Sequence, residues 1–305
     1  MSAKKSENSL SGPLLVALGA FLWATDALFR SNLVKTFQPL EIVFITHVYC
    51  TPLALLFVRR FRVSSTTTVH WLCLLVLSLG GSIAAMVLFT KAFAITTNYT
   101  IPILVQKLQP LFAVVLAIIF LREQVYRRVL IYGFIALAAS WGLSFGFAIP
   151  STQGAQFQVV TYALGAAIIW AGCTVTARKL LQSKHFLGTT AMRYLVALAA
   201  LSLMVDSPIA LIGRGLSQWQ NFLPMACGSG FLAIVIYYFG LRTTDAHVAT
   251  FCELTFPLGA ITINWLWLES PLTGQQIFFA LLLITSVLLL SNHQTRSPVS
   301  PEPPL

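Results

Sequence analysis

Ionisable side chains inside long apolar segments are the residues of this chain best suited to chemistry. Lys107 lies three residues before Pro110, and Glu253 lies four residues before Pro257. A charge in a low-dielectric segment costs roughly 2.5 kcal/mol or more, and usually faces a cavity or a partner. The pair predicts either a ligand cavity or a buried salt bridge. In the cavity, Lys107 would hold an anionic group, while Glu253 would bind a cationic group or a coupling proton.

Two glutamines and two prolines surround these charges. Gln106 and Gln109 flank Lys107, and their amides are expected to bind substrate or to hydrogen-bond between helices. Pro110 and Pro257 each remove a backbone hydrogen bond from a helix. The freed carbonyl groups and the kinks predict either hinges beside a binding site or static bends that fit the packing.

Arg193 and His47 lie at nearly equivalent depth in corresponding apolar segments of the two halves. Arg193 is expected to meet Glu253 or a substrate carboxylate. His47 either titrates near neutral pH or bonds to a neighbouring helix. Trp23 and Trp170 occupy corresponding positions in the first segment of each half, and are expected to wall a cavity or to serve as packing residues. Trp23 completes the predicted substrate-binding set.

The segments that carry these residues are predicted to be transmembrane helices. Of 305 residues, 57% are hydrophobic and 9% are charged, whereas about a quarter are charged in a soluble domain. A bilayer core needs about 20 apolar residues per helix. The sequence therefore predicts an all-α integral membrane protein with ten helices, near residues 12–31, 39–58, 69–91, 100–120, 128–148, 159–181, 188–206, 219–241, 246–268 and 274–291.

The distribution of basic residues predicts the topology. One set of alternate loops and termini contains thirteen Lys and Arg residues and the other set contains four. Basic loops stay cytoplasmic, so both termini are expected to be cytoplasmic in a multi-pass protein of the plasma or bacterial inner membrane. The net charge of +10 is not gathered into a dense basic run with interleaved aromatics, so nucleic acid is excluded as a partner.

The two halves of the chain align at a constant offset of 147 residues. This register pairs Trp23 with Trp170 and Pro110 with Pro257, which indicates duplication. Because each repeat has five helices, the second repeat enters the membrane from the opposite side and the repeats are inverted. The predicted organisation is an N-terminal segment (1–11), a first repeat (12–148), a linker (149–158), a second repeat (159–291) and a disordered Pro-rich tail (292–305).

One motif, present in each repeat, resembles the drug/metabolite transporter superfamily and specifically its EamA-like members. Small residues lead to a proline, followed by an apolar run and a terminal glutamate. The first copy reads LQPLFA at 108–113 and ends at Glu123, and the second reads TFPLGA at 255–260 and ends at Glu269. The resemblance covers residues 12–291. It implies ten helices, gradient-driven transport or exchange, and a central cavity lined by both halves.

A carrier is the function class that these features favour. The chain has no two-His metal motif, nucleophile elbow or phosphate loop, and its five cysteines are scattered singly, so we expect no enzyme, cofactor or metal. The expected partners are lipid, a small polar metabolite that is amino-acid-like or anionic, and protons for coupling. Sugars, nucleotide-type substrates and a non-transporting receptor or scaffold stay open as alternatives. Gly142 and Gly146 form a GxxxG pattern, compatible with a close helix contact or a homodimer.

Overall fold

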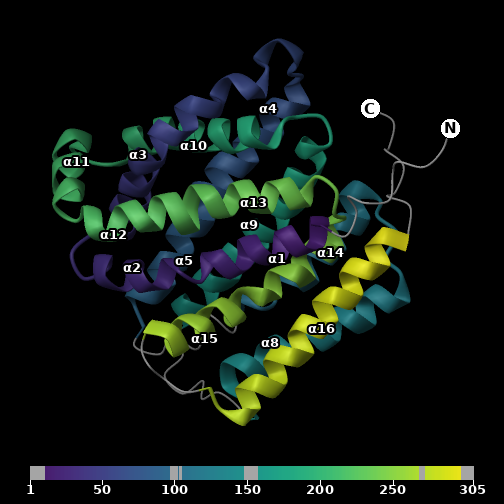
Figure 1. Ribbon diagram of the computed structural model, residues 1–305. Coiled ribbons are helices and arrows are strands. Elements are labelled where there is room, and N and C mark those ends of the chain that lie inside the picture. The colour runs from purple at the N-terminus through teal and green to yellow at the C-terminus, as the bar shows by residue number, and fades with distance from the viewer. Residues whose placement is uncertain (1–10, 97–101, 103–104, 148–156, 268–271, 297–305) are drawn as a thin grey trace.

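The computed structural model describes residues 11–96, 102, 105–147, 157–267 and 272–296, which form a bundle of packed helices (Figure 1). All regular elements in these ranges are helical, which confirms the predicted class. Nine described helices are long and apolar enough to span a membrane, and the shorter apolar helix Gln109–Leu121 lies where the predicted fourth span should be. Ten spans therefore stay a prediction. The nine are Gly12–Arg30, Pro39–Phe61, Thr68–Ala94, Arg127–Phe145, Phe157–Leu181, Phe186–Met204, Trp219–Leu241, Ala246–Ile263 and Gly274–Gln294.

The elements follow one another with short connections. The first half contains α1 (Ser11–Trp23), α2 (Asp26–Leu33), α3 (Pro39–Phe57), 3₁₀ turns at Val58–Phe61 and Val63–Ser65, α4 (Thr68–Leu75), a π-helical segment Val76–Ala84, α5 (Ala85–Ala94), α7 (Gln109–Leu116), a π-helical segment Ala117–Leu121 and α8 (Arg127–Phe145). The second half contains α9 (Phe157–Leu181), α10 (Phe186–Met204), α11 (Pro208–Ser217), α12 (Trp219–Pro224), a π-helical segment Met225–Leu232, α13 (Ala233–Leu241), α14 (Ala246–Cys252), a 3₁₀ turn Glu253–Thr255, α15 (Phe256–Trp267) and α16 (Gly274–Arg296). The sequence did not predict α11.

Small residues are buried along the central helix α9, and many large apolar residues elsewhere face outward, although others such as Phe44 and Phe222 are fully buried. Helix α9 buries Ala163, Ala167 and Ala171 completely, whereas Leu203 and Phe120 are exposed. In lipid, the hydrophobic effect gives helices no reason to associate, so close packing of small side chains has to hold them together. This distribution is the one expected of a bundle surrounded by lipid.

The helices pair in a pattern that corresponds between the two halves. Helix α1 packs along α13, and α9 packs along α5, while α3 packs on α10 and α8 packs on α16 (Figure 1). The first helix of each half therefore contacts the third helix of the other half. As a result, the centre of the bundle is surrounded by helices from both halves.

Irregular backbone also recurs at corresponding positions. The π-helical segments Val76–Ala84 and Met225–Leu232 overlap at the offset of 147 residues. A turn at Lys107 and Leu108 precedes α7, and the 3₁₀ turn Glu253–Thr255 precedes α15. Such interruptions are tolerated at membrane depth where the backbone is covered by protein or lines a cavity.

The two prolines differ from the mid-helix position that the sequence predicts. Pro110 is the second residue of α7, and Pro257 is the second residue of α15. In the first turn of a helix, a missing backbone N–H costs little because that donor has no intrahelical acceptor. The prolines therefore begin new helical segments after existing breaks.

The GxxxG pattern forms a contact within the chain. A Cβ atom on Gly142 would lie 2.3 Å from the ring of Phe279, and one on Gly146 would lie 2.6 Å from Gln275. Both partners belong to α16. The close helix contact is therefore the use of this pattern that the structure shows.

Candidate functional site

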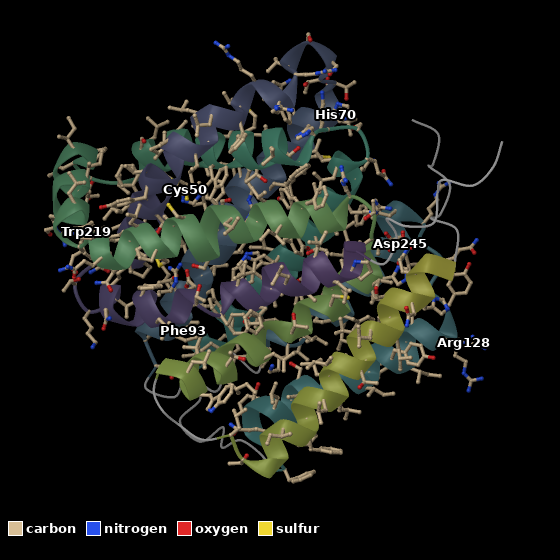
Figure 2. The ribbon with its side chains drawn as sticks, viewed as in Figure 1. Cys50, His70, Phe93, Arg128, Trp219 and Asp245 are labelled. Carbon is tan, nitrogen blue, oxygen red and sulfur yellow. The ribbon has the colours of Figure 1, made fainter. Side chains whose placement is uncertain are left out.

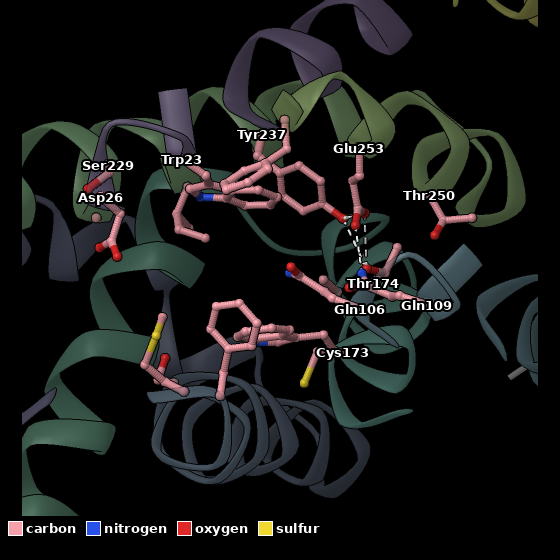
Figure 3. A pocket seen from close by; sticks show the side chains of 18 of the residues that line it. Trp23, Asp26, Gln106, Gln109, Cys173, Thr174, Ser229, Tyr237, Thr250 and Glu253 are labelled. Atoms are coloured by element: carbon pink, nitrogen blue, oxygen red, sulfur yellow. Dashed lines mark hydrogen bonds between the residues drawn. The ribbon is translucent and has the colours of Figure 1, made fainter. Parts of the chain in front are cut away.

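One cavity of about 230 Å³ lies among the helices of both halves (Figure 3). It contains every residue that the sequence singles out as substrate-binding or as a hinge. These are Trp23, His47, Gln106, Lys107, Gln109, Pro110, Arg193, Glu253 and Pro257. The predicted residues are therefore brought together, although their individual partners differ from those expected.

Glu253 lies at one end of the cavity and accepts three hydrogen bonds from uncharged donors. Oε1 accepts from the Tyr237 hydroxyl at 2.7 Å and from the Thr174 hydroxyl at 3.2 Å, and Oε2 accepts from Gln109 Nε2 at 2.7 Å (Figure 3). The donors come from α13, α9 and α7, so the carboxylate joins three helices from both halves. Gln106 points into the cavity (Figure 3).

The buried salt bridge between Lys107 and Glu253, one of the two alternatives that the sequence leaves open, is not formed. The Lys107 ammonium donates to the Ser140 hydroxyl of α8 at 2.8 Å. No described carboxylate lies within 4.0 Å of it. The alignment of the two halves predicts how deep each residue lies in the membrane, but it does not predict toward which neighbouring helix its side chain points. Lys107 and Glu253 therefore lie at similar predicted depth without contacting each other.

Arg193 forms no ion pair with Glu253, which is one of the two contacts that the sequence suggests for it. Arg193 Nε donates to the Ser82 hydroxyl at 2.7 Å, and Nη1 donates to the Tyr238 hydroxyl at 2.8 Å. The His47 ring packs against Tyr194 with centroids 5.0 Å apart, and its Nδ1 lies 2.7 Å from the Val43 carbonyl oxygen. This arrangement leaves a buried guanidinium without a described carboxylate partner.

Two aromatic pairs also line the cavity. Trp23 of α1 packs on Tyr237 of α13 with ring centroids 5.0 Å apart. Phe89 of α5 packs on Trp170 of α9 with centroids 5.2 Å apart. Each pair joins the first helix of one half to the third helix of the other. The cavity therefore has aromatic walls from both halves.

Asp26 and Arg30 add an ion pair to the cavity lining. Arg30 Nη2 donates to Asp26 Oδ1 at 2.9 Å, and Arg30 Nε also contacts this carboxylate. Figure 3 places Asp26 and Ser229 on the side of the cavity away from Glu253 and Thr250. The two ends of the cavity thus present different polar groups.

A polar cluster joins the helices at the bundle end where Asp245 and Arg128 lie, opposite Trp219 (Figure 2). Arg178 of α9 lies 3.5 Å from Asp245, and Gln294 of α16 donates to Asp245 at 2.9 Å. Arg178 also donates to the Leu241 carbonyl at 3.3 Å. These contacts tie α9, α13 and α16 together beyond the cavity.

Glu123, the terminal glutamate of the first motif, caps the start of α14 in the same region. Its carboxylate accepts from the backbone N–H groups of Ala246 at 2.8 Å and His247 at 3.1 Å, and contacts His247 Nδ1 at 2.5 Å. Burial acts to raise the pKa of Glu123, but these hydrogen bonds and the His247 charge lower it below its usual value. Glu269, the second terminal glutamate, lies outside the described residues.

Sequence reasoning missed the neutral residues that hold the charged ones. Three of them are the hydroxyl residues Thr174, Ser140 and Ser82. Burying a hydroxyl group costs much less free energy than burying a charge, so the sequence does not distinguish these residues from the many other Ser and Thr residues in the helices. Phe89 is one of 22 phenylalanines. Thr174 carried one signal, because it lies one helical turn after Trp170 and therefore shares its face.

Apolar helices around a cavity with charged and aromatic linings define a multi-pass membrane protein suited to binding a small molecule. The sequence matches the EamA-like transporter family over residues 10–145 and again over residues 158–292. The chain belongs to this family and is a small-molecule transporter.

Two relatives cover almost the whole chain. A protein named riboflavin transporter ImpX, from Fusobacterium nucleatum subsp. nucleatum, is 29% identical over 300 residues, which are 94% of this chain and 99% of that protein. A protein of known crystal structure has a TM-score of 0.71 at 16% identity, with 95% of this chain and 99% of the other covered. The second likeness shows the fold alone.

Proposed function

We propose that this chain is a secondary active transporter that moves a flat, hydroxylated heteroaromatic metabolite of the riboflavin type by alternating access. The observation that carries the proposal is the cavity, in which two aromatic pairs lie between chemically different polar ends. The name of the ImpX relative supports this substrate class. A planar ring system with a hydroxylated chain matches both parts of the lining.

The aromatic pairs suit a flat ligand because stacking acts on any planar ring. Stacking of a base on an aromatic side chain contributes roughly 1–3 kcal/mol. Trp23 and Tyr237 offer one aromatic surface, and Phe89 and Trp170 offer the other. The volume of about 230 Å³ is slightly below the roughly 300 Å³ at which typical ligand sites begin. A riboflavin-sized ligand therefore has to displace side chains, and Gln106 projects into the cavity (Figure 3).

The glutamine side of the cavity suits the edge of such a ring. A flavin ring carries an imide edge on which two carbonyl oxygens flank an N–H group, and an amide side chain offers the complementary donor and acceptor. The Gln106 amide forms no hydrogen bond with another described residue, whereas Gln109 is held by Glu253. Gln106 is therefore the side chain that we assign to this edge.

Alternating access follows from the proposed inverted repeat. The two matches to the family, the reciprocal helix pairs and the matching backbone interruptions support it. Interrupted helices near the midplane commonly form substrate sites in repeat transporters. We assign the hinges to the breaks before Pro110 and Pro257, where fewer backbone hydrogen bonds resist bending. The cavity is complete within one chain, so the proposal requires no homodimer.

Glu253 is the residue to which we assign proton coupling. Its carboxylate is held by three neutral donors and by no described cation, so gaining a proton neutralises the group and changes its hydrogen bonds. Through Tyr237, that change reaches the ring that packs on Trp23. Protonation and the shape of the aromatic wall are thereby linked.

The basic-residue distribution favours cytoplasmic termini.

Transport in liposomes tests this proposal. Purified protein is reconstituted, and riboflavin uptake is measured with and without an imposed pH gradient for the wild type, Glu253→Gln and the control Glu41→Gln, which lies outside the cavity lining. We expect Glu253→Gln to lose gradient-driven uptake while riboflavin exchange persists, and Glu41→Gln to keep both. Gradient-driven uptake by Glu253→Gln at the wild-type rate would place coupling elsewhere.

The same liposomes separate the alternatives. Lys107 and Arg193 have no carboxylate partner among the described residues, which favours an amino-acid-like or anionic substrate. Such a substrate would compete with riboflavin or replace it in a panel of amino acids, organic acids, sugars and nucleotides. Loss of its transport in Lys107→Ala and Arg193→Ala would favour that class. A receptor or scaffold would transport none of these and would tolerate neutralisation of the cavity charges.

A further inference from the structure

Two residues that line the cavity each have a buried polar side-chain atom without a hydrogen-bond partner among the described residues. Six described side chains have such an atom, and of these only His47 and Thr250 line the cavity. His47 is 5% exposed and Thr250 is fully buried. A buried polar atom without a partner costs roughly 1–3 kcal/mol. A ligand that supplies the missing bonds therefore gains affinity at these two positions.

The hydrogen bond at one ring nitrogen of His47 determines what the other nitrogen can do. The Val43 carbonyl oxygen can only accept, so Nδ1, which lies 2.7 Å from it, carries the hydrogen. In the neutral ring Nε2 is then an acceptor. The unpartnered atom is Nε2, and it requires a donor from the ligand.

Arg193 offers the opposite capacity beside His47. Both side chains line the cavity, and the His47 ring packs against Tyr194, the residue that follows Arg193 in α10. Arg193 has five N–H donors, of which one binds Ser82 and one binds Tyr238. The remaining N–H groups require acceptors, so a ligand group here meets an acceptor and several donors together.

A hydroxyl group satisfies both requirements, whereas an anion satisfies one. An O–H donates to His47 Nε2 while its oxygen accepts from Arg193. An acceptor-only carboxylate or phosphate would bind Arg193 but would face the acceptor Nε2 with another acceptor. We propose that His47 and Arg193 form the subsite for the neutral polyhydroxylated chain of the substrate. This inference rests on the proposed function and specifies which part of the ligand each end recognises.

Two flavins that differ only in this chain test the subsite. Riboflavin carries a ribityl chain, and lumiflavin has a methyl group in its place. The affinity of each is measured by quenching of flavin fluorescence on titration with purified protein. The proteins are the wild type, His47→Phe, which keeps a ring beside Tyr194, His47→Gln, which keeps an acceptor, and Thr250→Val, which removes the other unpartnered atom. Size-exclusion chromatography of each variant confirms that it is folded.

We expect His47→Phe to weaken riboflavin binding about 5- to 100-fold and to change lumiflavin binding less than about twofold. His47→Gln should recover part of the loss, and Thr250→Val should leave the ratio of the two affinities unchanged. If His47→Phe weakens both flavins equally, or neither, the subsite is refuted while flavin transport stands. If the wild type binds neither flavin, the proposed substrate class and the subsite both fail.

Discussion

The buried glutamate that caps α14 and a partly exposed glutamate in the first turn of α3 allow a matched test of what holds this bundle together. Glu123 accepts from two backbone N–H groups and contacts His247, and its side chain is 4% exposed. Glu41 accepts from the Gln38 backbone N–H at 2.8 Å and from Arg214 at 3.1 Å, where the arginine side chain is 50% exposed. The same change, Glu to Gln, is made at each position.

The contacts of each carboxylate set the expected magnitudes. In Glu123→Gln, the new NH₂ group faces a backbone or ring N–H, so at least one charge-assisted hydrogen bond is lost and the others weaken. Hydrogen bonds to charged groups contribute roughly 1.5–3 kcal/mol each, and charge approximately doubles their strength. We therefore expect a loss of about 2–4 kcal/mol for Glu123→Gln. Glu41→Gln should lose less than about 1 kcal/mol, because solvent screens an exposed ion pair.

Unfolding in mixed micelles measures the difference. The far-ultraviolet circular dichroism of each protein is followed as the mole fraction of sodium dodecyl sulfate rises, and the free energies of unfolding are compared with that of the wild type. The reasoning is refuted if Glu123→Gln and Glu41→Gln differ by less than about 0.5 kcal/mol. That result would mean that the cluster around Glu123 contributes no more than a solvent-exposed pair.

Three further predictions concern the same structure. The pKa of Glu123 is lower in the folded protein than its usual value of 4.5. The charged carboxylate therefore stabilises the fold at pH values above 4.5, and this contribution is lost as the pH falls through the pKa of the folded state. The difference in unfolding free energy between wild type and Glu123→Gln should therefore shrink below pH 4.5, which unfolding titrations at several pH values will measure. Gly259→Ala should lower the free energy of unfolding by about 1–3 kcal/mol, because the new Cβ would lie 2.4 Å from the Phe21 carbonyl oxygen. In the same unfolding assay the control Gly172→Ala should not destabilise the protein, because no atom lies within 4 Å of the position of its new Cβ. Arg193→Lys should weaken riboflavin binding at least about fivefold, since an ammonium does not reproduce the fork that reaches Ser82 and Tyr238 together, and unchanged quenching titrations would contradict this.

The sequence predicts the helical segments and the residues that line the cavity well, because both follow from the free energy of placing a side chain in the wrong solvent. Long apolar runs are expensive in water, and intramembrane charges are expensive in lipid. The predicted span 219–241 has the same bounds as the helix Trp219–Leu241. Lys107 and Glu253 line the same cavity for the second reason.

The pairing inside the cavity was not predictable by the same reasoning. Lys107 binds Ser140, and Arg193 binds Ser82 and Tyr238. These partners lie on helices distant in sequence, and a hydroxyl group in an apolar helix can also bond to its own backbone, as Ser144 does with the Ser140 carbonyl. The sequence therefore does not distinguish a hydroxyl that holds a charge from one that satisfies its own helix.

The same register that reveals the duplication also shows where the two halves diverge. Several cavity-lining residues occur in pairs separated by 147 positions: Trp23 with Trp170, Ser82 with Ser229, Pro110 with Pro257, His47 with Tyr194, Asp26 with Cys173 and Gln106 with Glu253. The first three pairs keep the residue type: the tryptophans belong to the aromatic walls, the serines supply hydroxyl groups and the prolines lie at the start of a helix. The last three pairs change the residue type, so the two halves contribute chemically different side chains at these positions. Corresponding helices of the two halves therefore line the cavity with different side chains. Such a cavity suits a ligand whose two ends differ, because the ligand can satisfy the polar groups at both ends in only one orientation.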